Sequence, residues 1–254
     1  MDEMLKVEDL CINFGGVIAA DHVSLDVAPG EIVGLIGPNG AGKTTVLNLI
    51  SGLLPATNGR VTLNGEDISK QPSYVRARKG IARTYQTPHM LKGATIKDNL
   101  MVGADLADGI GFLPSVFGKK GRDIRPEVDK YLEMAGFQLD WDTDIGSLPY
   151  GQQKMLEIIR SLLTKPKIIL VDEPAAGLNG KELEHSVKML KYAATQMGVG
   201  VLLIEHNMGM VMSVCSKIVV LNFGKVIATG TPEEVSKNEA VIEAYLGRDE
   251  NAGN

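Results

Sequence analysis

The chain has 254 residues, 44% of them hydrophobic and 22% charged, which suffices for one large domain or for a core domain with a smaller insertion. A net charge of -5 and scattered lysines and arginines argue against a nucleic-acid partner. No apolar run approaches the roughly 18 residues that span a bilayer, and the start of the chain lacks the basic-then-apolar pattern of a signal peptide. Cys11 and Cys215 have neither CxxC spacing nor a neighbouring histidine to complete a metal site, so we expect two small buried hydrophobic residues.

The first third of the chain has the pattern of short strands. Runs rich in β-branched residues cover 5–12, 23–27 and 32–36, with Gly and Pro between them, and predict an antiparallel start that leads into a buried strand. A helix is predicted over 44–50, followed by a strand and an Asn-Gly turn over 59–64.

From about residue 91 to 165 the patterns become helical. Helices are predicted over 95–104, 126–135 and 152–163, with almost no strand signal and with Gly and Pro clustered at 109–114. We therefore expect a helical subdomain at 91–164, inserted into an α/β core formed by 1–90 and 165–254.

The last third alternates strands with a helix. Strands are predicted over 168–171, 199–204, 218–221 and 226–228. The intervening helix carries one apolar stripe, made of Leu183, Val187, Leu190, Ala194 and Met197. Strand, helix, strand is a βαβ unit, so parallel pairing is expected. The predicted fold is an α/β core with a mixed sheet, an antiparallel β subdomain and an inserted α-helical subdomain.

The strongest motif lies between the predicted strand 32–36 and the helix that follows it. It fits the phosphate-binding pattern G-x-x-x-x-G-K-[ST], which predicts a P-loop NTPase core. Glycines let successive N–H groups turn inward around an anion, where a side chain would hold the phosphates away. Lys43 would meet the β- and γ-phosphates of ATP, and Thr44 would offer its hydroxyl to Mg²⁺. The predicted nucleotide-binding residues are Gly37, Pro38, Asn39, Gly40, Ala41, Gly42, Lys43, Thr44 and Thr45.

A second motif is the apolar run 168–171, which ends in Asp172 and Glu173. Alone, an apolar run before two acids is as often a helix start. Beside a phosphate loop, however, one carboxylate can hold Mg²⁺ and its neighbour can polarise an attacking water. We assign Asp172 to the metal and Glu173 to the general base.

With these motifs in order, the chain resembles the ATPases of ABC transporters over nearly its whole length. Gln86 resembles the glutamine of their Q-loop, and 175–179 resembles their D-loop. The resemblance implies that Phe14 stacks on adenine, that Gln86 and His206 join Glu173 as catalytic residues, and that Gln86 also contacts the metal. It places the signature motif, which closes the nucleotide site of a second subunit, at Leu148, Pro149, Tyr150, Gly151 and Gln152.

Two residues depart from the family pattern. Pro149 replaces a serine and so offers neither hydroxyl nor N–H to a phosphate. Asn179 replaces an aspartate and loses its charge. The variants, together with YGQQKMLEIIRSLL, DEPAAGLNGKE, IEHNMGMVM and AYLG, resemble the ATPases of branched-chain amino acid importers.

Other functions stay open at this point. The ATPases of lipopolysaccharide export and of urea import share much of this pattern. Some ABC ATPases are soluble machines that act on DNA or ribosomes, although those usually carry tandem copies or coiled coils. The remaining alternative is a module that binds nucleotide without hydrolysing it, and the presence of Glu173 as a predicted general base argues against this alternative.

The resemblance also implies partners. We expect a second ATPase subunit, identical or different, integral-membrane transporter subunits and a separate solute-binding protein, with this chain peripheral on the cytoplasmic face of the cell membrane. The helical subdomain and the apolar segment 87–93, with Pro88, Met90 and Leu91, are the expected contact surface for the membrane subunits.

Overall fold

A computed structural model describes residues 4–108 and 123–246. The predicted turn cluster at 109–114 and the tail after Gly247 lie outside this range. Within it, none of the helices combines the length and the apolar character that crossing a bilayer requires.

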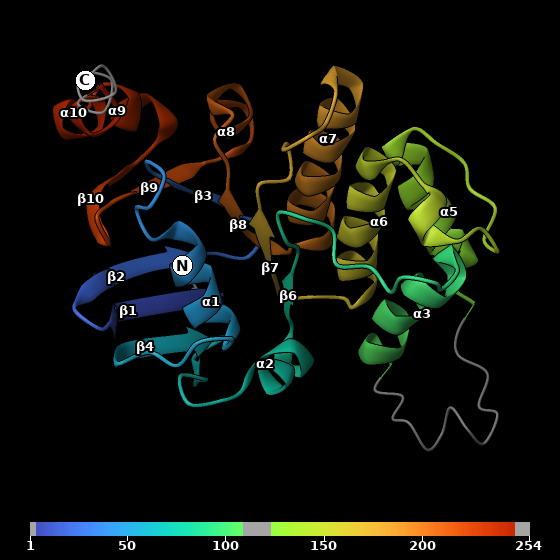
Figure 1. Cartoon of the computed structure of the whole chain (residues 1–254), viewed down its shortest axis with the longest axis horizontal. Coiled ribbons are helices and arrows are strands. Elements are labelled where there is room, and N and C mark those ends of the chain that lie inside the picture. The colour runs from blue at the N-terminus through green and yellow to red at the C-terminus, as the bar shows by residue number, and fades with distance from the viewer. Residues whose placement is uncertain (1–3, 109–122, 247–254) are drawn as a thin grey trace.

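Two sheets form the core (Figure 1). The smaller is antiparallel, in the order β2-β1-β4-β5. The larger has the order β10-β9-β3-β8-β7-β6 and is parallel except for β10, which pairs antiparallel with β9. The strands are β1 Leu5–Phe14, β2 Val17–Val27, β3 Ile32–Ile36, β4 Asn58–Leu63, β5 Glu66–Asp67, β6 Ile81–Arg83, β7 Ile168–Asp172, β8 Gly200–Ile204, β9 Lys217–Asn222 and β10 Lys225–Gly230.

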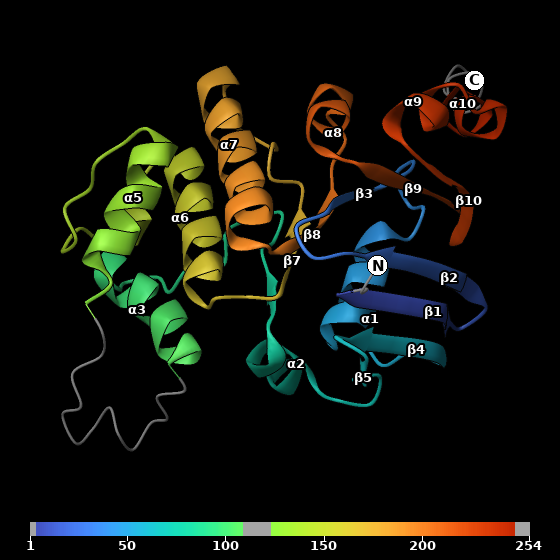
Figure 2. The same ribbon diagram turned by 180° about the vertical axis from the view of Figure 1, so that it is seen from behind.

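The helices fall into groups around these sheets. Figure 2 shows α3, α5 and α6 gathered beyond α7, on the side of the molecule away from the antiparallel sheet. In sequence, these three helices all lie between β6 and β7. The helical elements are α1 Lys43–Ser51, α2 Ser73–Lys79, α3 Ile96–Ala107, α5 Arg125–Ala135, the 3₁₀ turn η1 Ile145–Ser147, α6 Tyr150–Leu163, α7 Gly180–Met197, α8 Met208–Val214, α9 Pro232–Ser236 and α10 Glu239–Leu246.

The central strands β3, β7 and β8 of the large sheet are buried on both faces, which explains why they are continuous apolar runs rather than alternating ones. Ile169 and Val171 of β7 pack into the cluster that includes α6 and α7. Ile168 and Leu170 of the same strand pack into the cluster that includes α1 and the antiparallel sheet. Burying each such side chain stabilises the fold by about 1.5 to 3 kcal/mol. The predicted α/β fold, with its mixed sheet and antiparallel part, is confirmed.

The structure adds elements that were not predicted, among them α2, β6, α9 and α10. Two of the predicted elements differ in their bounds or in their buried face. Strand β2 begins at Val17 rather than at 23, because Val17 pairs with Phe14 across a Gly15-Gly16 turn while its side chain stays 69% exposed. Its early residues therefore lack the burial pattern of a half-buried strand. In α7 the buried face includes Leu190 and Ala194, as predicted, but it is shifted toward Ser186, Met189 and Ala193. Leu183, Val187 and Met197 of the predicted stripe pack only at its border.

Candidate nucleotide site

The loop between β3 and α1 is shaped by its glycines. Gly37, Gly40 and Gly42 have φ values of 149°, 80° and 103°, in the region that L side chains rarely adopt. A Cβ at Gly37 would collide with the carbonyl of Leu221, and one at Gly42 with the carbonyl of Ala19. The loop therefore needs glycine for its conformation at all three positions, and also for space at Gly37 and Gly42.

Lys43 begins α1 and folds back over the loop. Its ammonium donates to the carbonyl oxygens of Gly37, at 2.8 Å, and Pro38, at 3.0 Å, and the residue is 6% exposed. Thr44 is exposed and Thr45 half-buried. The loop thus holds a cation beside backbone N–H groups at the positive end of a helix, an arrangement suited to a polyphosphate.

The end of β7 supplies the carboxylates. Asp172 is 4% exposed, and its Oδ2 lies 3.5 Å from Nη2 of Arg83. Burial raises the pKa of the Asp172 carboxyl, and the Arg83 cation opposes that rise. Arg83 also donates to Oδ1 of Asn48 in α1, at 2.6 Å. One guanidinium therefore ties the helix that follows the phosphate loop to the end of β7.

Glu173 is the meeting point of three predicted catalytic residues. Its Oε2 accepts from Nε2 of Gln86 at 2.7 Å, and its Oε1 lies 2.8 Å from Nε2 of His206. Its φ of 47° is unusual for a residue other than glycine. Such a backbone persists only when surrounding contacts fix it, and it is common at functional sites.

Lys154 of α6 was not predicted as a site residue. It is 1% exposed, and its ammonium donates to the backbone carbonyls of Glu173 and, at 3.0 Å, Gln86. Burial lowers the pKa of Lys154, and Glu157 is the first of the nearby carboxylates that oppose this. Tyr150 donates to the same Gln86 carbonyl at 2.8 Å. A polar residue within the apolar pattern of α6 was the signal that could have revealed Lys154.

Glu205 is a second buried residue of the site that was not predicted. It is 3% exposed, and it accepts from the backbone N–H of Ala175 at 2.7 Å and of His206 at 2.7 Å. One buried carboxylate thus joins the turn after β7 to the residue that carries the imidazole. The two segments are 30 residues apart, so sequence spacing gave no indication of this link.

The segment that contains Gln86 is anchored to α6. Glu157, which is fully buried, accepts from the backbone N–H of Tyr85 at 3.3 Å and of His89 at 2.9 Å. Burial raises the pKa of its carboxyl. In the segment 87–93, Met90 packs against the core and Leu91 is 49% exposed.

The predicted signature residues begin α6. Pro149 is its N-cap and Tyr150 its first residue. The N–H groups at a helix start have no partner within the helix, so the missing N–H of Pro149 breaks no helical hydrogen bond. A Cβ at Gly151 would meet the Glu182 carboxylate, so α6 approaches α7 closely at this point. Leu148 and Gln152 are half-buried.

Asn179 has a clear local role. It caps α7 by accepting from the N–H groups of Lys181 and Glu182, and the Glu182 side chain completes a capping box. Asparagine caps as well as aspartate, so the loss of charge leaves this helix start intact. Phe14, at the end of β1, is 48% exposed and available for stacking.

The residues predicted to hold Mg²⁺ suit that ion chemically. Thr44 offers a hydroxyl, Asp172 a carboxylate and Gln86 an amide oxygen, and Mg²⁺ prefers such oxygen ligands.

The comparisons with known proteins point to one family. The family model described as ABC transporter matches residues 20–176, and the model described as branched-chain amino acid ATP-binding cassette transporter matches residues 225–251. The chain is 40% identical to the high-affinity branched-chain amino acid transport ATP-binding protein BraF of Pseudomonas aeruginosa, over 96% of this chain and 98% of that protein. It is 38% identical to LivG of Escherichia coli, which has the same description, over the same shares of the two chains.

A solved structure extends the comparison to the whole fold. The ADP conformation of MJ1267, described as an ATP-binding cassette of an ABC transporter, has a TM-score of 0.82 and 34% identity, over 97% of this chain and all of that one. A nucleotide-free cassette gives a TM-score of 0.79 at 33% identity, over 96% of this chain and 98% of that one. The chain therefore belongs to the ABC transporter family and is one of its ATP-binding cassettes, an ATPase.

Proposed function

We propose that this ATPase works in a dimer and drives the import of branched-chain amino acids. The observation that supports branched-chain amino acids as the solute is the match of residues 225–251 to the cassettes of branched-chain amino acid transporters. Relatives with that description match along nearly the full chain. The matched segment includes β10, α9 and α10, which in sequence lie apart from the phosphate-loop, carboxylate and signature motifs.

Within one chain, each residue has a distinct task. The loop at 37–42 and Lys43 bind the phosphates, and the exposed ring of Phe14 supports the adenine. Thr44, Asp172 and Gln86 would hold Mg²⁺, which when bound neutralises charge on the β- and γ-phosphates. Glu173 accepts a proton from the attacking water, and Gln86 and His206 hold the two oxygens of its carboxylate in place.

The second half of each site would come from another subunit. The start of α6 presents helical N–H groups at the positive end of a dipole, a second place where a phosphate can bind. The internal contacts of this segment include the hydrogen bond from the Tyr150 hydroxyl to the Gln86 carbonyl and the close approach of Gly151 to Glu182. If a second subunit completes each site, ATPase activity per chain should rise with protein concentration in the range where most chains are monomers. A constant rate per chain, with monomers confirmed, contradicts it.

An apolar groove is the surface on which we propose that the membrane subunits dock. It measures about 340 Å³ and runs between the α2–β6 segment and helices α3 and α6. Its exposed apolar side chains are Leu53 at 48%, Tyr74 at 62%, Val102 at 50% and Leu106 at 38%. Such a patch beside the Gln86 segment suits a partner helix with apolar side chains. Residues 87–93, the expected docking segment, are absent from the groove lining.

One substitution tests this docking surface. Leu106→Glu should spare the ATPase of the isolated chain but abolish co-purification with the membrane subunits and transport. Met212→Glu is the matched control, because Met212 is 41% exposed and lies outside the groove lining. Normal transport by the Leu106 variant would exclude the groove as the docking site.

Transport itself tests the solute. The complex should be purified from native membranes, placed in vesicles with its cytoplasmic face accessible to ATP, and assayed for uptake of labelled leucine with and without its solute-binding protein. Leucine uptake that isoleucine and valine inhibit, and urea does not, is the expected result. Urea uptake, lipopolysaccharide movement, or purification with DNA or ribosomes instead of membrane subunits would each favour one of the alternative functions.

A further inference from the structure

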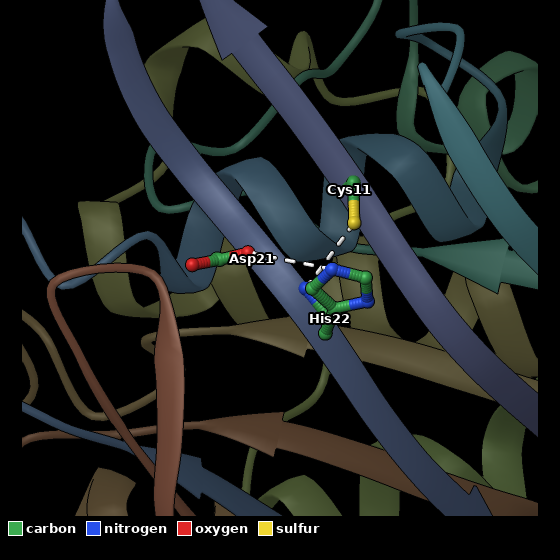
Figure 3. A group of neighbouring side chains, drawn as sticks. All are labelled: Cys11, Asp21 and His22. Atoms are coloured by element: carbon green, nitrogen blue, oxygen red, sulfur yellow. Dashed lines mark hydrogen bonds and ion pairs between the residues drawn. The ribbon is translucent and has the colours of Figure 1, made fainter.

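The antiparallel sheet carries a cluster of possible metal ligands away from the catalytic carboxylates. Leu10 pairs with Val23 and Ile12 with Ala20, so Cys11 on β1 faces two residues of β2, Asp21 and His22. This two-against-one pairing is a β-bulge, which re-aims side chains and turns consecutive residues toward one side. Figure 3 shows the Cys11 sulfur and the Asp21 carboxylate approaching His22 from different directions.

A second irregularity brings in another carboxylate. Between Val7 and Leu10 the register shifts again, and Asp9 lies in this shift. Asp9 has a φ of 49° and His22 a φ of 52°, left-handed values that are uncommon for residues other than glycine. Two neighbouring bulges with unusual backbones are better explained by a local task than by strand packing alone.

The donor atoms converge. One ligand atom each from Cys11, Asp21 and His22 lie within 4.8 Å of one another. His22 Nε2 is 3.9 Å from Oδ1 of Asp21, whereas its Nδ1 is 3.6 Å from Oδ1 of Asp9. The expectation that neither cysteine has a histidine nearby is thus wrong for Cys11, because strand pairing closes a gap of eleven residues. Cys215, by contrast, is buried, and burial raises the pKa of its thiol to about 12.

We propose that Cys11, Asp21 and His22 form a binding site for Zn²⁺ or a similar transition-metal ion. The Cys11 thiolate, a carboxylate oxygen of Asp21 and Nε2 of His22 are the ligands. Asp9 Oδ1, now 3.6 Å from Nδ1 of His22, would accept the Nδ1–H and orient the ring once the imidazole turns toward the ion. A carboxylate behind a ligating histidine is a common arrangement around zinc. The fourth position is open to solvent, since the side chains of His22 and Asp9 are 67% and 69% exposed.

The distances suit such an ion after a small adjustment. Ligands around tetrahedral zinc, at about 2.0 to 2.3 Å from the metal, are about 3.3 to 3.8 Å apart. Separations of up to 4.8 Å therefore need to close by about 1 Å, which rotation of the exposed His22 side chain toward the half-buried Cys11 and Asp21 can supply.

One nearby cation competes for the Asp21 carboxylate but leaves one of its oxygens for a metal ion. The Lys225 ammonium lies 3.2 Å from Oδ2 of Asp21. It therefore contacts one carboxylate oxygen, whereas His22 lies near the other, Oδ1. Thiolate and imidazole favour zinc, cobalt, nickel or copper over Mg²⁺, which prefers oxygen. The site is thereby distinct in selectivity from the Mg²⁺ that accompanies ATP.

The cluster is linked to the phosphate loop through the backbone. The N–H of Asp21 donates to the carbonyl of Gly224 at 2.9 Å, and the N–H of Gly224 donates to the carbonyl of Ala41 at 2.9 Å. An ion that clamps β1 to β2 would therefore sit two hydrogen bonds from the loop that binds phosphate.

Cobalt binding provides the test. The reduced, chelator-treated and nucleotide-free chain is titrated with Co²⁺, whose thiolate complexes absorb in the near ultraviolet, and then with Zn²⁺ in competition. We expect one ion per chain, a thiolate absorption band, and release of protons on binding. Cys11→Ser and His22→Asn should each weaken binding at least about 100-fold, and Asp9→Asn about 10- to 100-fold.

Two controls separate the site from general surface charge. Cys215→Ser removes the other thiol and should leave the affinity unchanged, and Lys225→Gln removes a competing cation and should bind at least as tightly. If a ligand variant does not fold, Zn²⁺ protection of Cys11 against alkylation in the parent chain serves instead. Absence of a thiolate band, equal affinity of the Cys11→Ser variant, or no protection of Cys11 would overturn the proposal.

Discussion

The phosphate loop and the end of β7 lie at the same edge of the large sheet, but they are constructed differently. Residues 37–42 form a site from consecutive backbone groups, and Lys43 is held by carbonyls of the same loop. At the end of β7, by contrast, Glu173 depends on Gln86, 87 residues away, and on His206, 33 residues away. One region is local in sequence, and the other is assembled by the fold.

This difference determines how each region should respond to substitution. The loop keeps its shape through glycine conformations, so loss of one side chain there removes a contact with the nucleotide but leaves the loop intact. The β7 end is a network of buried polar groups, in which the loss of one member leaves others unpaired. Substitutions at the loop should mainly change binding, and substitutions in the network should mainly change catalysis and stability.

The largest expected effect is that of Glu173→Gln. It removes the proposed base but keeps the size of the side chain, so hydrolysis should fall by about 10² to 10⁴ while ATP affinity stays nearly unchanged. An ATP-bound dimer should accumulate, visible by size-exclusion chromatography. Glu184→Gln is the control, because Glu184 is exposed on α7. Hydrolysis at the parent rate would show that Glu173 is not the base.

Lys43→Ala tests the local region. Charge-assisted hydrogen bonds contribute about 1.5 to 3 kcal/mol, so ATP affinity should weaken by about 10- to 100-fold. The midpoint of urea unfolding should also fall, because the carbonyls of Gly37 and Pro38 lose their donor, so it is the loss of ATP affinity that distinguishes this variant from those in the network. Binding of a fluorescent ATP analogue measures the effect, with Lys188→Ala on the exposed face of α7 as control. Unchanged affinity would contradict the phosphate-loop assignment.

The same difference explains what the sequence could predict. The phosphate loop, the two carboxylates after β7 and the order of most strands and helices are local patterns, and they were predicted from composition and spacing. Lys154 and Glu205 were missed as site residues because their partners are brought to them by packing of α6 and by the turn after β7. Nothing in the residues next to them indicates those partners.

Surface features were the least predictable. The apolar groove combines side chains from α2, α3 and the end of α1, so no single segment shows it. The Cys11 and His22 cluster arises from register shifts between β1 and β2. Such shifts depend on how two strands pair, and alternation within one strand does not reveal them.

Lys154→Met tests the network. Methionine fills much of the space but donates no hydrogen bond, so the carbonyls of Gln86 and Glu173 lose a partner, at a cost of about 1 to 3 kcal/mol in unfolding free energy. We also expect kcat to fall by about 10-fold with little change in KM for ATP, because Glu173 is positioned less well. Lys154→Arg should recover part of kcat. A loss of stability with an unchanged kcat would mean that Lys154 only supports the fold.

The smallest expected effect concerns Glu157, which anchors the Gln86 segment. Because burial raises the pKa of its carboxyl in the folded chain, the folded state keeps a proton that the unfolded state has lost once pH exceeds about 4.3. The contribution of this group to the free energy of unfolding therefore falls as pH rises from about 4.3 to the raised pKa of the folded chain. The fall is about 1.4 kcal/mol for each pH unit between the two pKa values.

Glu157→Gln removes this dependence. Its amide oxygen can still accept from His89, but the N–H of Tyr85 would face an amide nitrogen, which costs stability equally at every pH. The unfolding free energy of the variant, minus that of the parent, should therefore increase with pH above about 4.3 and then level off. Urea unfolding between about pH 4 and pH 8 measures it, with Glu184→Gln as the exposed control. A difference that is constant over this range would mean that the parent buries Glu157 without any energetic cost to its charged form.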